Sequence, residues 1–464
     1  MTVNTTSDFH ALCAQVRALL FPASPRVYVQ TFGCQQNVAD GEKMLGIACE
    51  MGYTPCERPE EADLILVNTC AIREHAEIKA LSVVGQYKHL WEQNPDLIIG
   101  VTGCMTAQAH RVEQIRKSYP YITFTLAPGA LQEMPQMVSL ALRNRRGENV
   151  ARRHFTLEQT TDSVVEGIPV SRTERHRAWV SIMYGCNNFC TYCIVPYVRG
   201  RERSRASSEI VEEVRGLIAD GVHEITLLGQ NVNSYRGDVD FATLLEKLAQ
   251  LDGEFLLRFM TSHPKDVPDD LIRVMAQYPE HIAPHFHLPL QSGSDRILAA
   301  MNRRYTTERY LGIVDRLRAA MPDISLSTDI IVGFPGEDER DFAQTLDILR
   351  RVRFDTVYAF VYSPRKGTAA AELPGRISDE EKKDRMNRLL TLQGDISLAC
   401  AKRFEGRVLR ALVDGPAKSG ESVYSARTAE NRLVHFTSDR NFTGQYVTLH
   451  IDRADAFALY GSLV

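Results

Sequence analysis

Three cysteines lie within eight residues near the middle of the chain, in the spacing Cys186-x-x-x-Cys190-x-x-Cys193. They follow an apolar segment that is typical of a β-strand. Thiolates on one tight loop can hold three irons of a 4Fe–4S cluster, and with no fourth cysteine nearby one iron stays open to another ligand. A structural zinc site is the alternative, but zinc takes four ligands, and the next histidine, His223, lies thirty residues on without a paired ligand. The spacing therefore favours an iron–sulfur cluster with an open iron.

A second set of three cysteines is dispersed along the N-terminal region. Cys34, Cys70 and Cys104 are 36 and then 34 residues apart, about one strand–helix unit each. Each follows an apolar segment, and the carboxyl ends of parallel strands meet along one edge of a sheet, where ligands bind. We therefore expect these thiols to converge, although dispersed cysteines are individually more often small core residues. Gly33 and Gly103 allow close backbone approach beside two of them. The other four cysteines lack this placement, and we expect structural roles for Cys13, Cys49, Cys56 and Cys400.

The elements that must position these cysteines form an α/β pattern in the N-terminal region. In residues 26–142, apolar strand segments alternate with helical periodicity, which predicts a parallel sheet covered by helices. A short helical extension, residues 1–25, is expected before this domain. The polar, arginine-rich residues 143–171 are typical of a linker.

Two further domains are expected. Residues 172–401 contain six apolar strand segments, mostly separated by helices, which predicts a partial (βα)6 barrel, shorter than the full eight-unit form. Residues 402–464 change to short alternating strands, which predicts a small all-β barrel or sandwich. The expected strands are Trp179–Met183, Glu224–Leu228, Phe255–Met260, His285–Leu290, Ile324–Val332 and Phe354–Tyr362 in the central domain, and Val408–Val413, Val423–Arg427, Leu433–Thr437 and Tyr446–Ile451 in the C-terminal one.

Composition limits the class of protein. Hydrophobic residues make up 44% and charged residues 24% of the 464 residues, which excludes a disordered, collagen-like or coiled-coil chain. The net charge of −4 gives no chain-wide basic field, so a nucleic-acid partner needs a local patch. We expect no membrane partner and no secretory signal, and hence a cytoplasmic protein. In that reducing compartment, clustered cysteines indicate metal, cluster or redox chemistry instead of disulfides.

These features together resemble the radical S-adenosylmethionine (SAM) methylthiotransferases. The three-cysteine loop after the first barrel strand resembles the signature of the radical SAM superfamily, and the C-terminal domain resembles TRAM, an RNA-binding β fold. The resemblance covers nearly the whole chain from about Arg26, and is closest to the branch that acts on isopentenylated adenosine in tRNA. Gln36 and Ala71-Ile72 depart from residues often found in that branch, but leave every expected ligand in place. The segments that carry the resemblance are Gly33–Asn37, Asn68–Glu74, Tyr184–Cys190, Leu228–Tyr235, Arg258–Lys265 and Leu288–Gly293.

The resemblance implies two 4Fe–4S clusters and SAM as cofactors. One SAM would methylate sulfur held at an auxiliary cluster, and a second would yield a 5′-deoxyadenosyl radical that abstracts hydrogen from adenine C2 before the methylated sulfur couples there. A radical is needed because no ordinary side-chain base can remove that hydrogen as a proton. Implied partners are the tRNA anticodon stem-loop, a reductant such as flavodoxin or ferredoxin, and a sulfur-donor protein. The implied ligands are Cys186, Cys190 and Cys193 for the SAM-binding cluster, and Cys34, Cys70 and Cys104 for the auxiliary cluster.

Five other residues at the expected barrel mouth are implied to contact SAM or the nucleoside. They are Tyr192, Gln230, Ser262, Gln291 and Asp329. A packing role for the tyrosine and strand-end capping by the other four are equally good interpretations. Two histidines spaced by two share one strand face, and we expect satisfied barrel-interior side chains there rather than metal ligands. These histidines are His285 and His287.

Positive charge gathers beside the cluster loop. Between Arg172 and Arg205 there are seven arginines against two glutamates. Phosphate neutralisation there would bring RNA to the site, so RNA contact is a better interpretation than a solvated surface. Residues 401–464 hold nine Lys and Arg against seven Asp and Glu, so charge alone does not predict RNA binding by that region. The expected RNA contacts are Arg199, Arg201, Arg203 and Arg205.

Three alternatives remain. A sibling methylthiotransferase would act on threonylcarbamoyladenosine in tRNA or on an aspartate of a ribosomal protein, with the same clusters. A two-cluster electron-transfer protein fits less well, because an electron carrier gains nothing from an open iron. An RNA-binding module with structural zinc would contain zinc and no iron.

Overall fold

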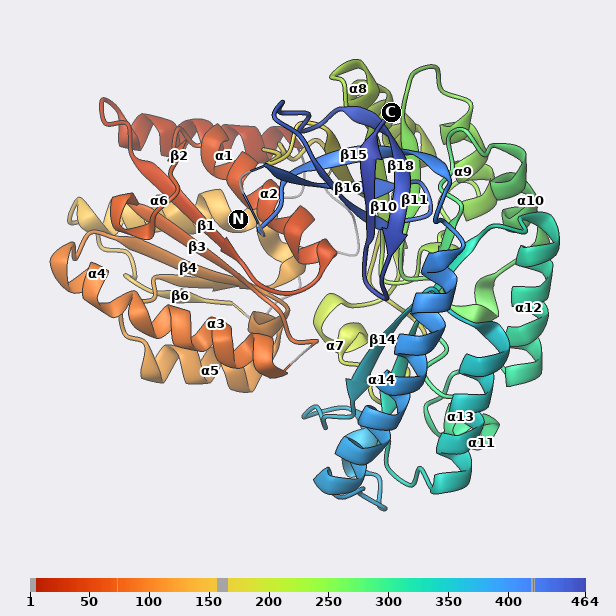
Figure 1. Cartoon of the computed structure of the whole chain (residues 1–464). Coiled ribbons are helices and arrows are strands. Elements are labelled where there is room, and N and C mark those ends of the chain that lie inside the picture. Colours follow the sequence, from red (N-terminus) through yellow and green to blue (C-terminus); the bar gives the residue numbers. More distant parts are fainter. Residues whose placement is uncertain (1–5, 73, 157–165, 419, 421) are drawn as a thin grey trace. The chain divides into compact units, whose positions relative to one another are not determined.

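The computed structural model describes residues 6–464 apart from residues 73, 157–165, 419 and 421 (Figure 1). The chain forms two compact units. The first comprises residues 1–173, 183–187 and 193–205, and the second comprises residues 174–182, 188–192 and 206–464. The central cysteine loop therefore contributes Cys186 and Cys193 to the first unit and Cys190 to the second.

A six-stranded parallel sheet in the order β2-β1-β3-β4-β5-β6 forms the frame of the first unit. Its central strands are buried on both faces, as expected for a parallel sheet between helices. In β3, Leu64 and Leu66 face one hydrophobic core, whereas Ile65 and Val67 face the other. The strands are β1 (Arg26–Thr31), β2 (Thr54–Pro55), β3 (Leu64–Thr69), β4 (Ile98–Gly103), β5 (Phe124–Leu126) and β6 (His154–Phe155).

Helices cover both faces of this sheet (Figure 1). One core is closed by α1, α2 and α6, and the other by α3, α4 and α5. The helices are α1 (Thr6–Leu20), α2 (Gln35–Glu50), α3 (Glu74–Gln86), α4 (Lys88–Gln93), α5 (Ala109–Ser118) and α6 (Met134–Arg145), with the 3₁₀ turns η1 (Pro59–Glu61), η2 (Cys104–Ala107) and η3 (Pro128–Glu133). The predicted parallel α/β domain is confirmed.

Two expectations about the edges of this domain need correction in part. The helix expected within residues 1–25 is present as α1, but it belongs to the domain, because Phe9, Cys13 and Val16 are fully buried in the core with α2 and α6. Residues 143–171 are not solely a linker, because β6 pairs with β5 as the sixth strand. This strand has only two residues and directly follows Arg152 and Arg153, so the sequence shows no apolar run there. Part of the expected linker, residues 157–165, lies outside the described residues.

The segment after the cysteine loop adds a small element to the first unit. A short helix, α7 (Val195–Arg199), is followed by β9 (Arg203–Ser204), which pairs antiparallel with β8 (Met183–Tyr184). The helix packs on η2, which begins at Cys104. Thus the residues that follow one cysteine set contact the element that begins at a cysteine of the other.

The second unit contains the predicted six-stranded partial barrel. Its parallel strands form the sheets β7-β10-β11 and β12-β13-β14, linked through a parallel bridge between Leu257 and Ile282. The strands are β7 (Arg177–Ser181), β10 (Glu224–Leu228), β11 (Leu256–Phe259), β12 (His285–His287), β13 (Ser325–Val332) and β14 (Thr356–Val361). The helices are α8 (Ser207–Ala219), α9 (Phe241–Ala249), α10 (Asp269–Gln277), α11 (Asp295–Ala300), α12 (Thr307–Ala320), α13 (Glu339–Val352) and α14 (Asp379–Lys402), with η4 (Val232–Ser234), η5 (Pro264–Asp266) and η6 (Ala369–Glu372).

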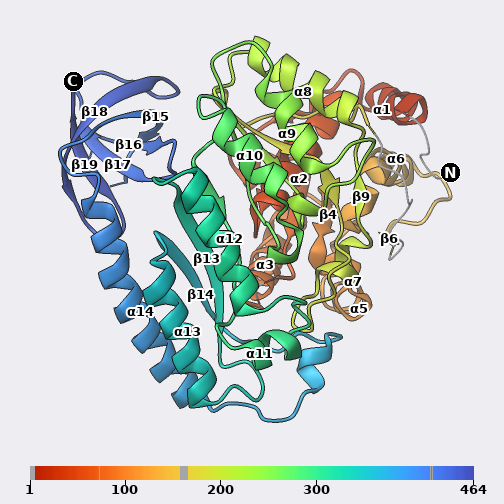
Figure 2. The same ribbon diagram turned by 90° about the vertical axis from the view of Figure 1, so that its right-hand side faces the viewer.

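Helix α14 leads into a closed five-stranded barrel at the C-terminus (Figure 2). The strands close in the order β15-β16-β17-β19-β18, and only the β17–β19 pair is parallel. A small barrel was predicted, but its last strand was missed, because Tyr460-Gly461-Ser462 breaks the apolar alternation. The strands are β15 (Val408–Pro416), β16 (Val423–Thr428), β17 (Leu433–Thr437), β18 (Tyr446–Ala454) and β19 (Leu459–Leu463).

Candidate active site

The dispersed cysteines come together at the carboxyl edge of the N-terminal sheet. Cys34, Cys70 and Cys104 follow the neighbouring strands β1, β3 and β4, with Cys34 at the start of α2. The last two are buried and the first is half-buried. Burial raises the pKa of Cys104 to about 12, and the neighbouring Cys70 and Cys34 contribute to the rise. Because β1, β3 and β4 are neighbours in the parallel sheet, the three thiols lie along the same edge of it.

Two glycines form a cradle for this cysteine set. Gly33 has a φ of +115°, and a Cβ there would lie 2.4 Å from the Cβ and 2.8 Å from the Sγ of Cys70. Gly103 has a φ of +101°, and its Cβ would lie 2.2 Å from the carbonyl oxygen of Thr69. Both positions require glycine because a side chain would be strained and would also collide.

Asn37 fixes the loops that carry the thiols. Its amide nitrogen donates to the carbonyl oxygens of Phe32, at 2.8 Å, and Thr69, at 2.9 Å. Its amide oxygen lies 3.7 Å from the Sγ of Cys34. The backbone nitrogen of Ile72 donates to the Sγ of Cys70 at 3.3 Å. The Asn37 amide thus ties the cysteine loops together, and the sulfurs of Cys34 and Cys70 each make one hydrogen-bond contact within these loops.

Arg199, at the end of α7, reaches this cysteine set. Its Nε lies 3.1 Å from the Sγ of Cys104, and its Nη2 lies 2.8 Å from both Asp40 and the amide oxygen of Asn37. Only 4% of the side chain is exposed. Arg199 is one of the four arginines expected to contact RNA.

That assignment is corrected at two of the four arginines. Arg199 is enclosed beside the thiols, and Arg205 is buried in an ion pair with Glu166 at 2.7 Å. Neither presents a charge to a phosphate backbone. Arg201 is exposed and Arg203 is half-buried, so the surface required for RNA contact exists at these two positions. A run of arginines gives no local sign of which members fold inward.

The donor set of this site fits the cluster that the sequence predicted. Three thiols converge beside two glycines whose replacement would fill the space around them. Among the described residues, no three His, Cys, Asp or Glu side chains are placed to hold a single metal ion. Cysteine thiolates are the usual protein ligands of iron–sulfur clusters, so the chemistry of this donor set is compatible with such a group.

The central cysteine loop is held from both sides of its sequence. Cys186 donates its backbone nitrogen to the carbonyl oxygen of Gly200 at 3.1 Å, and a Cβ at Gly185 would lie 2.0 Å from the carbonyl oxygen of Arg201. In the second unit, Arg303 places Nη1 3.5 Å from the Sγ of Cys190. The arginine is buried and also donates to the carbonyl oxygen of Pro289 at 2.7 Å. A buried guanidinium therefore accompanies a cysteine of each set.

Polar atoms without partners gather at the ends of β10 and β11. Asn231, Asn233, Ser262 and His263 are buried, and each has at least one side-chain oxygen or nitrogen without a hydrogen-bond partner among the described residues. Burial and the nearby charge of Arg303 hold the pKa of His263 far below its usual range, so the imidazole is neutral. Unsatisfied buried polar groups are costly, so these atoms at the barrel mouth are available to hydrogen-bond a polar ligand.

The five other predicted contact residues lie in different surroundings. Gln230 is half-buried after β10, next to the unsatisfied asparagines. Gln291 is buried with a φ of +70°, and its backbone nitrogen donates to the carbonyl oxygen of Asp329 at 2.8 Å. Asp329 itself lies 3.7 Å from His287. Tyr192 packs against a cluster of buried side chains that includes Phe334. Ser262 alone combines burial with an unpartnered side-chain oxygen.

The two histidines expected to be satisfied interior side chains lie in the partial barrel. His285 and His287 each lie 2.9 Å from the Ser327 hydroxyl, which confirms that they are satisfied interior side chains. The predicted site residues do not include Asn231, Asn233 or His263. Their signal was available, because they directly follow the strand ends at which Gln230 and Ser262 were selected.

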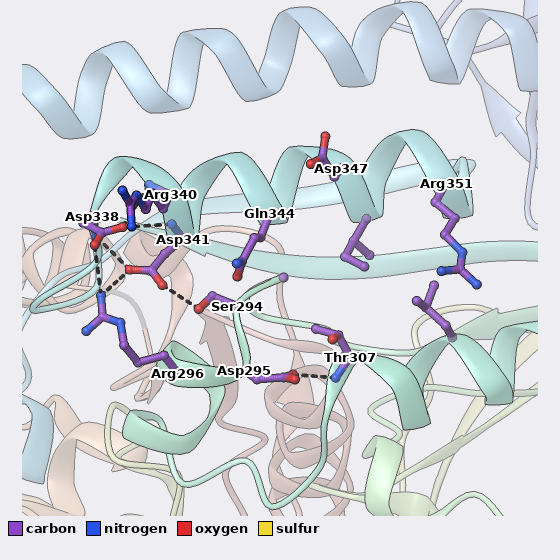
Figure 3. Close-up of a pocket in the computed structure, with 13 residues that line it drawn as sticks. Ser294, Asp295, Arg296, Thr307, Asp338, Arg340, Asp341, Gln344, Asp347 and Arg351 are labelled. Carbon is purple, nitrogen blue, oxygen red and sulfur yellow. Dashed lines mark hydrogen bonds and ion pairs between the residues drawn. The ribbon is translucent and has the colours of Figure 1, made fainter.

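A separate cavity of about 650 Å³ lies between α11, α12 and α13 (Figure 3). Its carboxylates are already used in holding these helices. Asp338 and Asp341 form a capping box at the start of α13, and Ser294 donates to Asp341 at 2.6 Å. None of the predicted ligands lines the cavity. We therefore assign it to helix packing and not to the active site.

Two family models match the chain, and each of them covers one of the two cysteine sets. The Radical SAM superfamily matches residues 180–349, which include the central loop. The "Uncharacterized protein family UPF0004" matches residues 26–127, which include the other three thiols. Among the described residues, no helix combines the length and apolar character needed to cross a membrane.

Curated relatives align with almost all of the chain. The tRNA-2-methylthio-N(6)-dimethylallyladenosine synthase of Thermoanaerobacter sp. (strain X514) is 46% identical over 441 residues, covering 94% of this chain and 92% of that protein. The protein of the same name from Carboxydothermus hydrogenoformans is 46% identical over 449 residues, covering 95% and 100%.

Solved structures support the fold. The radical S-adenosylmethionine methyltransferase TsrM from Kitasatospora setae aligns with a TM-score of 0.55 and 14% identity, covering 75% of this chain and 77% of that one. The cobalamin-dependent S-adenosylmethionine radical enzyme OxsB aligns with a TM-score of 0.52 and 13% identity, covering 80% and 56%. At such identity the likeness concerns the fold alone.

Proposed function

Because the chain belongs to the radical SAM methylthiotransferase family, together with the tRNA-2-methylthio-N(6)-dimethylallyladenosine synthases, we propose that it methylthiolates N6-isopentenyladenosine next to the anticodon of tRNA. The C2–H bond of adenine is broken and a C2–S bond is formed. The hydrogen atom leaves on 5′-deoxyadenosine, the methyl group comes from a second SAM, and the sulfur comes from the protein's auxiliary cluster. The convergence of three thiols from three strand ends is the observation that carries this proposal.

The two cysteine sets divide the chemistry. When bound, the two clusters with SAM would supply a carbon-centred radical at one set and a methylated sulfur at the other. The chain's own part is to hold, orient and enclose. The central set would be the ligands of the SAM-binding cluster, and the dispersed set those of the auxiliary cluster. These six residues are Cys186, Cys190, Cys193, Cys34, Cys70 and Cys104.

Side chains at the barrel mouth would orient SAM and the nucleoside. The neutral imidazole of His263 and the amide of Asn233 offer unpaired polar atoms in a buried setting. A hydrogen bond from the ligand would also remove the free-energy cost of leaving these atoms unpaired. Ser262 is the predicted contact that this reasoning supports most directly. Tyr192, Gln230, Gln291 and Asp329 remain proposed contacts.

Two surfaces would receive the tRNA. Arg201 is exposed and Arg203 is partly so, directly after the loop that carries Cys193. Such cations neutralise phosphates and position RNA without reading its sequence. The closed C-terminal barrel would be the TRAM module. A one-electron reductant such as flavodoxin or ferredoxin and a sulfur-donor protein are the further proposed partners, and the substrate places the reaction in the cytoplasm.

Paired cysteine variants test this division of labour. Cys34→Ala should retain SAM cleavage but lose methylthiolated product, whereas Cys190→Ala should lose both. The intact chain should hold about eight irons, and either variant fewer. Cys49→Ala is the control. Cys49 is half-buried in α2, the helix that begins directly after Cys34, but it lies near the other end of that helix, away from the strand ends. Full product formation by Cys34→Ala would refute the auxiliary site.

The substrate is tested separately from the clusters. Nucleoside mass spectrometry of tRNA from a strain that lacks the protein should show no 2-methylthio-isopentenyladenosine, with the unmethylthiolated nucleoside in its place. Loss of a methylthiolated threonylcarbamoyladenosine instead would transfer the assignment to the sibling enzyme.

A further inference from the structure

The guanidinium of Arg199 is used in an unusual way for a buried cation. It has one carboxylate partner, Asp40, at 2.8 Å, which would suffice for a structural ion pair. Yet Nε is directed at the Sγ of Cys104 at 3.1 Å, while Nη2 bonds both Asp40 and the Asn37 amide oxygen. The planar fork thus joins a thiol to a carboxylate, in a place that water does not reach.

We propose that Arg199 sets the reduction potential of the auxiliary cluster through its hydrogen bond to the Cys104 sulfur, with Asp40 as the opposing charge. This inference rests on the proposed function, which supplies the cluster. The charge on a cluster and the hydrogen bonds to its sulfurs are main determinants of its potential. An added electron makes the sulfurs more negative, so a buried donor and cation beside one of them favours the reduced form.

Asp40 acts in the opposite direction. Its carboxylate lies against the same Nη2, and it also accepts from the Gln36 amide at 3.2 Å. A buried negative charge near the cluster disfavours the added electron, and it holds part of the guanidinium's charge away from the sulfur. The two residues should therefore move the potential in opposite directions when each is neutralised.

The geometry also explains why the residue is arginine. Lysine presents one compact ammonium group, which cannot reach the sulfur and the Asp40–Asn37 pair from fixed, separate nitrogens. Arg199 lies six residues after Cys193, in the short helix α7 that packs on η2. One short segment therefore carries a predicted ligand of the SAM-binding cluster and the cation that contacts the auxiliary set.

The test measures potentials in the full-length chain. Substituting alanine at Cys186, Cys190 and Cys193 leaves the auxiliary site as the only predicted cluster. In that background, redox titration followed by electron paramagnetic resonance compares the reconstituted parent with Arg199→Gln, Arg199→Lys and Asp40→Asn. Arg111→Gln is the matched control, because Arg111 pairs with the buried Glu77 at 2.6 Å in the same sheet domain and not with a cysteine.

Opposite shifts are expected from the two neutralising variants. At a fixed solution potential, Arg199→Gln should lower the ratio of reduced to oxidised cluster about tenfold, a shift of about 59 mV toward more negative potential. Asp40→Asn should shift it positive, Arg199→Lys should be intermediate, and Arg111→Gln should match the parent. If Arg199→Gln binds no cluster, Asp40→Asn becomes the test of the inference. A positive shift of the potential supports the inference, and a negative shift contradicts it.

Two results would overturn the inference in distinguishable ways. If the parent background binds no cluster, the auxiliary site of the proposed function fails, and this inference fails with it. If the cluster forms but Asp40→Asn and every folded Arg199 variant keep the parent's potential, only the role of Arg199 is refuted, and its contacts are structural.

Discussion

A single glycine, Gly33, determines how closely the backbone approaches the thiol of Cys70. At Gly33 the backbone turns with a φ of +115°, so that the Cα stands against the side chain of Cys70. Even a methyl group would fall within 2.8 Å of that sulfur and would displace it. The position therefore constrains cluster binding through contact, beyond the strain that a positive φ imposes on any other residue.

Gly33→Ala should consequently lose the auxiliary cluster and keep SAM cleavage. We expect iron to fall from about eight to about four per chain and methylthiolated product to disappear. Gly147→Ala is the matched control, because Gly147 also has a positive φ, +80°, but a Cβ there meets nothing within 4 Å. Iron analysis and assay of 5′-deoxyadenosine on both variants provide the measurement. Equal iron in the two would mean that the cradle does not shape the site.

At the residue scale, the sequence predicted types of chemistry better than directions of side chains. Cysteine spacing relative to strand ends located three converging thiols, since strand polarity alone places those ends on one edge. It could not show that Arg199 turns inward while Arg201 stays exposed, because both belong to one alternating arginine run. Burial at these positions depends on Asp40 and Glu166, which lie far away in sequence.

At the scale of elements, the turn between β13 and α13 is held by a buried carboxylate. Glu337 accepts from the Gly333 backbone nitrogen at 2.7 Å and from Arg385 at 2.9 Å. Burial raises the pKa of Glu337 to about 6 despite these two donors. The charged form is therefore costly at neutral pH, and the turn is most stable when this carboxyl is protonated.

The pH dependence of stability should reveal that cost. Because the folded-state pKa of Glu337 lies above its ordinary value of 4.5, its stabilising contribution is complete below pH 4.5 and is lost as pH rises through 6. The loss is about 2 kcal/mol. Urea unfolding of parent and Glu337→Gln at pH 4 and pH 7 should show a stability difference that changes by about this amount. Trp179, in β7, reports on this unit if Trp91 is replaced by phenylalanine. A difference independent of pH would contradict the buried-carboxyl account.

The sequence predicted the strands that are buried on both faces, and it missed two strands that lack an apolar run. Strands β3 and β4 are continuous apolar runs because helices cover both faces, and such runs are visible in sequence. Strand β6 has two residues, and β19 contains a glycine and a serine, so neither has a period to detect. Their pairing is supplied by neighbouring strands, which a local pattern does not contain.

At the scale of the whole molecule, the C-terminal barrel is joined to the partial barrel by buried charges. Asp355, between α13 and β14, accepts from Arg403 at 3.1 Å and from Arg432 in the C-terminal barrel. Arg258, in β11, pairs with Glu224 at 2.6 Å and donates to the carbonyl oxygens of Thr428 and Ala429. The C-terminal barrel is therefore not an independent appendage, and its removal would take Arg432 from Asp355 and two carbonyl acceptors from Arg258.

Asp355→Ala should accordingly destabilise the second unit as a whole. Removing one partner of a buried pair leaves an uncompensated charge, which costs about 3–5 kcal/mol, whereas an exposed pair is worth less than about 1 kcal/mol. Asp347→Ala provides the second case, since Asp347 is 71% exposed and pairs with Arg350 on the same helix. Urea unfolding followed by Trp179 fluorescence, with proteolysis near residue 402 as a local probe, measures both variants. If Asp355→Ala left the fluorescence transition unchanged and increased only the cleavage near residue 402, the two barrels would be separable. Because both arginines would be left without their carboxylate, we expect the unfolding transition and the cleavage to shift together.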